Sequence, residues 1–320
     1  MGQYALRRLA ISVPVLLVVT VIAFVLVNLA PGNPVDAMID PATRAEIGPE
    51  AIEARKAALG LNDPLLVRYG KWLRELVQGN FGYSVVSGQA VGAQILDRLG
   101  PTLLLMGTAI ILGTLIGIPL GVISAVRQYS WIDYTTTVLG FLAISTPSFF
   151  LGLAFMYFFA VHLGWLPTSG MRTLGVPEST IDLIEHMIMP VTVLTLAHTP
   201  LSMRYARSSM LEALRQDYVT TARSKGLKER IVLVRHALRN ALIPLITIIG
   251  VSLPEMLSGA VITETIFQWP GMGLLAMRAV NGRDYPLILG IILVTAALVL
   301  ISNLIADLLY AVADPRIRFR

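Results

Sequence analysis

The sequence contains no cysteine, and only 14% of its residues are charged. Without cysteine, disulfide frameworks, Cys-ligated zinc or iron–sulfur sites and thiol catalysis are excluded. Soluble domains carry about 25% charged residues, so charge is scarce here. By contrast, 55% of the 320 residues are apolar, and the mean hydropathy is +0.70. A soluble fold of this length has too little interior for so much apolar surface, which indicates an integral membrane protein and excludes intrinsic disorder.

Signatures of catalysis are missing as well. A P-loop needs Gly-x-x-x-x-Gly-Lys-Ser/Thr to cradle phosphates, but the only Gly-Lys pair, Gly70–Lys71, is followed by Trp72. The four histidines are scattered without HExxH spacing, and no Gly-x-Ser-x-Gly elbow occurs. We therefore predict that the chain is not an enzyme and has no catalytic, cofactor-binding or metal-ligating residues.

Six apolar runs are long enough to cross a hydrocarbon core of about 30 Å as helices. They are Leu9–Leu29, Thr102–Val126, Val138–Val161, Met187–Met203, Ala241–Ile262 and Leu287–Ala311. The first run is too long for a typical signal peptide and lacks a small-x-small cleavage site before Ala30, so we expect a retained helix. Pro190 and Pro200 interrupt the fourth, which a membrane helix tolerates. The sequence predicts an all-α membrane protein with six transmembrane helices.

The basic residues predict the orientation, because positive charge near the ends of spans stays cytoplasmic. Arg7–Arg8 precede the first span, Arg127 follows the second, and three arginines close the chain. Between spans four and five, Arg204–Arg239 holds nine basic and three acidic residues, a net +6, so the other residues sum to −1 of the total +5. We expect both termini on the cytoplasmic side. The sequence pI is about 9.6, and we assign this basic character to the one loop and not to nucleic-acid binding.

These spans divide the chain into four parts. They are residues 1–30 with the first helix, an extracytoplasmic segment at 31–100, a five-helix core at 101–311 with a cytoplasmic loop at 204–240, and a tail at 312–320. Pro49–Leu59 and Pro64–Val77 have helical apolar spacing behind a proline, which predicts a mostly helical cap. The cap is either a docking face for an external partner or a lid over the helix ends.

Gly113, Gly117 and Gly121 form a stripe along the second span. Glycine lets helix backbones approach closely in lipid, so the stripe indicates either packing within the chain or a subunit interface.

Glu255 lies inside the fifth span, directly after Pro254, and that span has no basic residue. Ionisable groups in the bilayer are costly and often functional. Glu255 either faces a water-filled substrate pathway or is neutral and hydrogen-bonded at a helix kink. Asp307 lies near the inner end of the sixth span, within reach of the interface, and needs no special role.

The basic loop contains a stretch, Asp217–Gly226, that looks like a short helix ended by glycine. Here the sequence resembles the permeases of ABC importers for dipeptides, oligopeptides and nickel, which carry the signature EAA-x-x-x-G. Thr220, Thr221 and Ala222 occupy the EAA places, and Gly226 has the required spacing. Only Ala222 and Gly226 match the general pattern, whereas the whole of Asp217–Pro244 is similar to the peptide-type variant.

The resemblance extends over nearly the whole chain. Further similar strings are Tyr4 with Arg7–Arg8–Leu9, Ala30–Pro34, Asn80–Ser84, Ser145–Pro147, Gly164–Pro167, Glu264–Phe267, Trp269–Gly271 and Arg283–Pro286. Each string is weak alone, but together they are collinear over about 300 residues.

The resemblance implies a type I ABC importer permease in the plasma (inner) membrane of a bacterium or archaeon. It implies a second homologous permease, two ATPase subunits that hold ATP and Mg, and an extracytoplasmic substrate-binding protein. It also implies a coupling helix that contacts an ATPase through Asp217, Tyr218, Thr220, Thr221, Ala222, Arg223, Lys225 and Gly226. Arg223 and Lys225 face either that partner or lipid headgroups.

The implied substrate is a short peptide, with nickel, glutathione or an oligosaccharide as alternatives in the same family. A stand-alone secondary transporter is the alternative from another class. Inverted repeats would favour it, and we find no convincing internal repeat.

Overall fold

The described part of the chain is helical. The computed structural model describes residues 2–29, 50, 53, 57, 62–242 and 261–313. Within these ranges the only extended pairing is an isolated bridge between Tyr83 and Ala90. The helices are α1 (Gly2–Leu29), α5 (Leu65–Val77), α6 (Val91–Val126), α7 (Trp131–Ser145), α8 (Ser148–Phe155), the π-helix η1 (Met156–His162), α9 (Thr180–Leu214), α10 (Asp217–Ser224), α11 (Glu229–Ile231), the π-helix η2 (Val232–Leu238), α13 (Val261–Ile266), α14 (Met272–Asn281) and α15 (Tyr285–Ala313).

Four helices in the described ranges are long and apolar enough to cross a membrane. They are α1, α6, α9 and α15, which contain the first, second, fourth and sixth predicted spans. The helix α9 continues through Pro190 and Pro200 for 35 residues. At about 1.5 Å per residue it measures roughly 50 Å, so it extends beyond a hydrocarbon core of about 30 Å.

The predicted third span, Val138–Val161, is not one straight helix. The chain bends by 94° between α7 and the continuous pair α8–η1. The bend lies at Thr146, which has extended backbone angles (φ −88°, ψ 120°) ahead of Pro147. A proline ring clashes with a helical conformation of the preceding residue and donates no backbone hydrogen bond, so the helix ends there.

The predicted fifth span, Ala241–Ile262, lies mostly outside the described residues, and Glu255 lies there too. The described ranges thus contain four spans, or five if the bent pair counts as one. Six spans and cytoplasmic termini remain predictions. Of the predicted cap, Pro49–Leu59 also falls largely outside, whereas α5 forms directly after Pro64, as expected for the second cap helix.

In the described structure the stripe Gly113–Gly117–Gly121 packs against another helix of the same chain. Of the two predicted uses, packing within the chain and a subunit interface, the structure shows the first. A Cβ atom on Gly117 would lie 2.7 Å from the carbonyl oxygen of Thr199, and one on Gly121 would overlap the carbonyl oxygen of Met203. Both contacts are on α9. The absence of side chains therefore lets α6 and α9 pack backbone to backbone and form the central pair of the fold.

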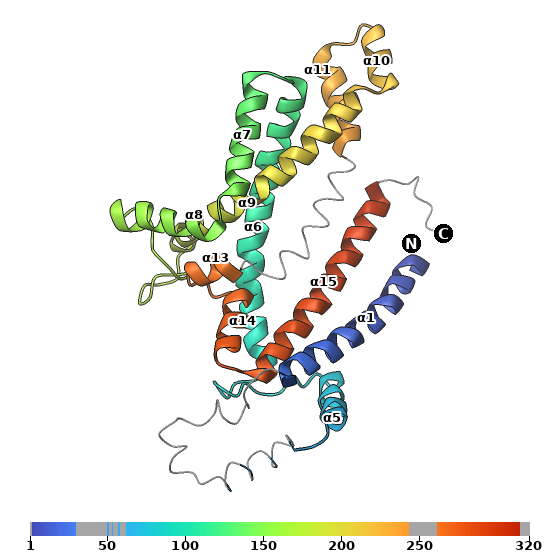
Figure 1. Cartoon of the computed structure of the whole chain (residues 1–320). Coiled ribbons are helices and arrows are strands. Elements are labelled where there is room, and N and C mark those ends of the chain that lie inside the picture. Colours follow the sequence, from blue (N-terminus) through green and yellow to red (C-terminus); the bar gives the residue numbers. More distant parts are fainter. Residues whose placement is uncertain are drawn as a thin grey trace.

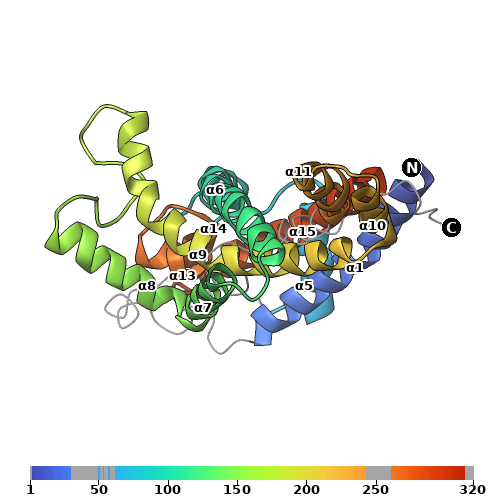
Figure 2. The same ribbon diagram turned by 90° about the horizontal axis from the view of Figure 1, so that it is seen from above.

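The two ends of the molecule carry different elements. Figure 1 shows α10 and α11 at the top of the molecule and α5 at the opposite end. The views in Figures 1 and 2 agree that α1 runs beside α15, apart from the group of α6, α7 and α9. Between the first turns of α1 and the last turns of α15, Arg8 and Asp307 pair at 3.0 Å and join the two helices.

A polar clasp closes the end that carries α5. The hydroxyl of Ser84 donates to the carboxylate of Asp284, which also accepts the backbone N–H groups of Val85 at 3.2 Å and Leu287 at 3.3 Å. Ser84 and Asp284 are both buried. The clasp thus ties the loop before α6 to the start of α15.

Candidate functional site

The helix α10 contains the predicted coupling residues. It begins at Asp217, whose negative charge lies in the first turn, and Arg223 lies in the last turn. Both charges complement the helix dipole. Val219 and Ala222 are three residues apart, so they share one face, and both are buried.

Gly226 ends α10 with a Schellman motif. Its φ of +74° lies in the left-handed region, which favours glycine. The Gly226 N–H donates to the Arg223 carbonyl oxygen at 2.9 Å, and the Leu227 N–H donates to that of Ala222 at 3.4 Å. The predicted short helix that ends at a glycine is therefore confirmed.

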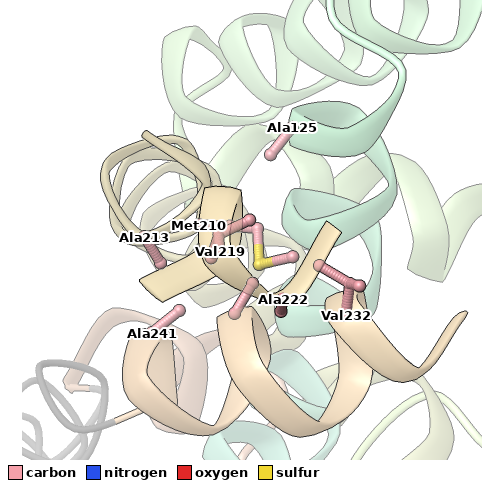
Figure 3. Close-up of a cluster of buried hydrophobic side chains, with 8 residues drawn as sticks. Ala125, Met210, Ala213, Val219, Ala222, Val232 and Ala241 are labelled. Atoms are coloured by element: carbon pink, nitrogen blue, oxygen red, sulfur yellow. The ribbon is translucent and has the colours of Figure 1, made fainter. Parts of the chain in front are cut away.

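The buried face of α10 rests on a small hydrophobic core. Figure 3 shows Val219 and Ala222 of α10 beside buried side chains from other segments of the chain. The cluster consists of Ala125, Met210, Ala213, Val219, Ala222, Val232, Ala237 and Ala241. Its members come from α6, α9, α10 and the segment from η2 onward, so α10 is fastened to the central α6–α9 pair.

The other face of α10 is polar and open to solvent. Thr220, Thr221, Lys225 and Gly226 are exposed, and Tyr218 has 38% of its surface exposed. Leu227 adds an apolar side chain directly after the turn, with 39% exposed. A rigid helix with a polar outer face and a few exposed apolar groups is suited to bind a protein groove.

Arg223 is exposed but engaged within the chain. Its guanidinium donates two hydrogen bonds to the carboxylate of Glu229, at 2.7 and 3.3 Å. This pairing lowers the pKa of Glu229 and raises that of Arg223. The bridge spans the turn at Gly226, so Arg223 stabilises the loop, whereas Lys225 has no described partner and faces outward.

The structure brings the predicted coupling residues together on one helix and its C-terminal turn. They divide into an inner member, Ala222, which contacts the core, and outer members with exposed side chains. Their role in coupling stays a prediction. Glu255 lies outside the described residues, so its place relative to a pathway also stays a prediction.

Two buried carboxyl groups were not predicted from the sequence. Asp133, at the start of α7, accepts two hydrogen bonds from Arg207 of α9, at 2.8 and 2.9 Å. Glu264 of α13 is fully buried and accepts hydrogen bonds from the Thr102 hydroxyl at 2.9 Å and the Leu274 N–H at 3.0 Å. The sequence offers one general signal for them: an ionisable residue in apolar surroundings needs a hydrogen-bond or ion-pair partner. That signal does not say which residue the partner is.

Comparison with known families decides the class of the chain. The family described as binding-protein-dependent transport system inner membrane component matches residues 117–319, and its N-terminal counterpart matches residues 1–106. The chain belongs to this family. It is a transport permease, a multi-pass protein of the inner membrane.

Individual relatives agree over the whole length. The chain is 46% identical over 320 residues to the oligopeptide transport system permease protein AppB of Bacillus subtilis, covering all of both chains. It is 37% identical over 337 residues to the dipeptide transport system permease protein DppB of Alkalihalophilus pseudofirmus, again covering all of both. The prediction of an ABC importer permease is therefore confirmed.

The fold is that of a type I ABC importer permease. An inward-facing structure of the MetNI methionine ABC transporter matches with a TM-score of 0.56 at 17% identity, covering 69% of this chain and 96% of the other. The permease fold is thus shared despite low sequence identity.

Proposed function

We propose that this permease forms half of the translocation pathway of an importer for short peptides. The observation that carries the proposal is α10, a helix ended by Gly226, fastened to the α6–α9 pair and open on its outer face. The full-length relatives named for oligopeptide and dipeptide transport support peptides as the substrate. A glutathione transport permease is also 37% identical, and glutathione, itself a short peptide, is the second candidate substrate.

The fold offers a mechanical route from α10 to the membrane. Only Arg215 and Gln216 separate α10 from α9, and α9 is continuous over its 35 residues. The α9 helix packs backbone to backbone on α6 at Gly117 and Gly121. A push on α10 is therefore passed to the central pair as a rigid-body movement, whereas a loosely held loop would absorb it.

The proposed assembly places the energy source on other chains. Two ATPase subunits hold ATP and Mg, one of them binds the outer face of α10, and a homologous permease completes the pathway. An extracytoplasmic binding protein delivers the peptide at the end that carries α5. The cell is a bacterium or archaeon, and α10 and both termini are on the cytoplasmic side of the membrane. The net +6 of Arg204–Arg239 supports this orientation.

Uptake by the complete complex in proteoliposomes tests the proposal. With ATP available to the ATPases and the binding protein present, we expect uptake of a labelled dipeptide or tripeptide and none of nickel or maltotriose. Uptake that proceeds without ATPase subunits and follows an ion gradient would instead identify a secondary transporter. ATP-driven uptake of nickel alone would contradict the peptide assignment.

A further inference from the structure

A cleft opens where the ends of α1 and α15 meet α5, at the end of the molecule opposite α10. Its volume is about 520 Å³. Phe24 and Asn28 of α1, Arg68 and Trp72 of α5 and Leu289 of α15 contribute to its lining. This volume lies within the range of about 300–1,000 Å³ that is typical of small-molecule sites.

The cleft lies at the boundary of the apolar spans. Phe24 and Asn28 are in the last two turns of the span Ala10–Leu29, and Leu289 is in the second turn of the span Tyr285–Asp307. Both helices therefore contribute the residues at which their apolar stretch ends. In a bilayer this is the boundary between the hydrocarbon core and the headgroup region that contains the lipid phosphates.

Arg68 is held in the cleft by a neutral group. The side chain of Asn28 donates from Nδ2 to the Phe24 carbonyl oxygen at 2.7 Å, and its Oδ1 accepts from Arg68 Nη2 at 2.5 Å. Among the residues that the structure describes, no carboxylate pairs with Arg68. Lys71, one turn later, does have a partner, since its Nζ lies 2.6 Å from Asp63. The cleft thus holds an oriented guanidinium with no direct ion pair. The cations Lys71 and Arg74 and one carboxylate, Glu75, also line it, and Glu75 accepts a hydrogen bond from the Asn80 side chain, so the lining is positive on balance.

The outer surface of α5 is apolar beside these cations. No residue of α5 is fully buried, and Leu66 and Val77 are 83% and 81% exposed. A helix with exposed leucine and valine next to arginine and lysine is typical of one that lies in the membrane interface. Trp72, against the Phe24 ring at 5.6 Å, has the place that tryptophan prefers at this depth.

We propose that this cleft binds one anionic phospholipid. The phosphate lies on Arg68, in the bidentate geometry that guanidinium and phosphate favour, and an acyl chain runs over Phe24 and Leu289 into the bilayer. The combination of a fixed cation with an apolar wall at the end of two spans fits a lipid. A soluble phosphate or a peptide carboxylate could bind Arg68 but would not contact the apolar side chains of Phe24 and Leu289.

Fluorescence of Trp72 in the complete complex tests the site, with brominated phosphatidylglycerol and brominated phosphatidylcholine as probes in mixed nanodiscs. The difference between the unchanged protein and Trp72→Phe isolates the signal from the cleft. We expect brominated phosphatidylglycerol to quench this signal saturably and at about tenfold lower mole fraction than brominated phosphatidylcholine. Equal quenching by the two lipids would overturn the proposal.

Arg68→Gln and Lys71→Gln form a matched pair, because each removes one positive charge from the same helix. We expect Arg68→Gln to abolish most of the preference for phosphatidylglycerol and Lys71→Gln to change it less than about twofold, since Asp63 already neutralises Lys71. Equal effects would show that only net charge matters and would contradict a built site. Displacement of the lipid by free glycerol phosphate or by a dipeptide would assign the cleft to a soluble ligand and also overturn the proposal.

Discussion

The amide nitrogen of Leu227 lies 3.4 Å from the carbonyl oxygen of Ala222, and the hydrogen bond between them closes α10. The bond exists because the backbone reverses at Gly226, with φ +74°. Ala222 is buried in the core beneath α10, while Leu227 is 39% exposed on the other side of the turn. One backbone conformation therefore defines both where the helix ends and which side chains it presents.

Gly226→Val should uncouple ATP hydrolysis from peptide uptake. A β-branched residue at a positive φ costs about 1–2 kcal/mol, enough to distort the Schellman turn without unfolding the membrane helices. A Cβ atom at this position would meet nothing within 4 Å, so the effect arises from backbone strain alone. We expect normal membrane insertion and at least a fivefold lower ratio of peptide transported to ATP hydrolysed, measured in proteoliposomes.

Two variants serve as controls for this strain. Gly226→Asn should retain most of the coupling, because asparagine tolerates the left-handed conformation. Gly175→Val places the same side chain at a similar φ of +79°, also in open space, in the loop before α9. Coupling as low in Gly175→Val as in Gly226→Val would assign the loss to general damage.

Charge reversal should separate Lys225 from Arg223. Lys225→Glu is expected to weaken binding of the ATPase subunit about tenfold with little change in thermal stability, because Lys225 faces outward. Arg223→Glu places a like charge beside Glu229 and should loosen the turn itself. Pull-down of the ATPases and thermal unfolding of the isolated permease measure the two effects. Undiminished ATPase binding in Lys225→Glu would assign this residue to the lipid headgroups instead.

Gly121→Ala should destabilise the α6–α9 pair by about 2 kcal/mol, since the added methyl group overlaps the carbonyl oxygen of Met203. Gly100→Ala is the matched control on the same helix, where a Cβ atom meets nothing within 4 Å. Thermal unfolding in detergent compares the two. Because alanine favours the helical conformation more than glycine does, Gly100→Ala should keep or raise the melting temperature. A melting temperature that is also kept or raised in Gly121→Ala would contradict close packing at the glycine stripe.

The clasp between Ser84 and Asp284 should behave as a coupled pair. Ser84→Ala and Asp284→Ala each remove one partner of a buried hydrogen bond, at an expected cost of about 1–3 kcal/mol. Because the two residues contact each other, the double variant should cost less than the sum of the single ones by at least about 0.5 kcal/mol. Strict additivity in a double-mutant cycle of unfolding free energies would contradict the contact.

Local signals explain which parts of the structure were predictable. The turn at Gly226 and the helix after Pro64 depend on the conformational preferences of single residues, which the sequence displays directly. The break at Pro147 was available from the same kind of signal, but the continuous apolar run from Val138 to Val161 concealed it. Hydropathy shows how long an apolar segment is but not whether its helix is straight.

Contacts between distant segments were beyond the sequence. The Ser84–Asp284 clasp joins residues 200 positions apart, and Glu264 finds Thr102 across 162 positions. Asp284 and Glu264 both lie in short segments that resemble the permease family. A short segment does not show which distant residue each carboxyl group contacts. The division of the coupling residues into a buried Ala222 and an exposed Lys225 likewise depends on the core beneath α10.

Cross-linking of single cysteines tests the central claim most directly, because the natural sequence has no cysteine. In the complete complex, Lys225→Cys should cross-link to an ATPase subunit through a short bifunctional reagent and should resist impermeant thiol reagents added outside intact cells. Ser87→Cys, exposed near the opposite end, should react with those reagents and give no ATPase cross-link. Reaction of Lys225→Cys from outside, with no cross-link to the ATPase, would contradict the assignment of α10 as the coupling helix.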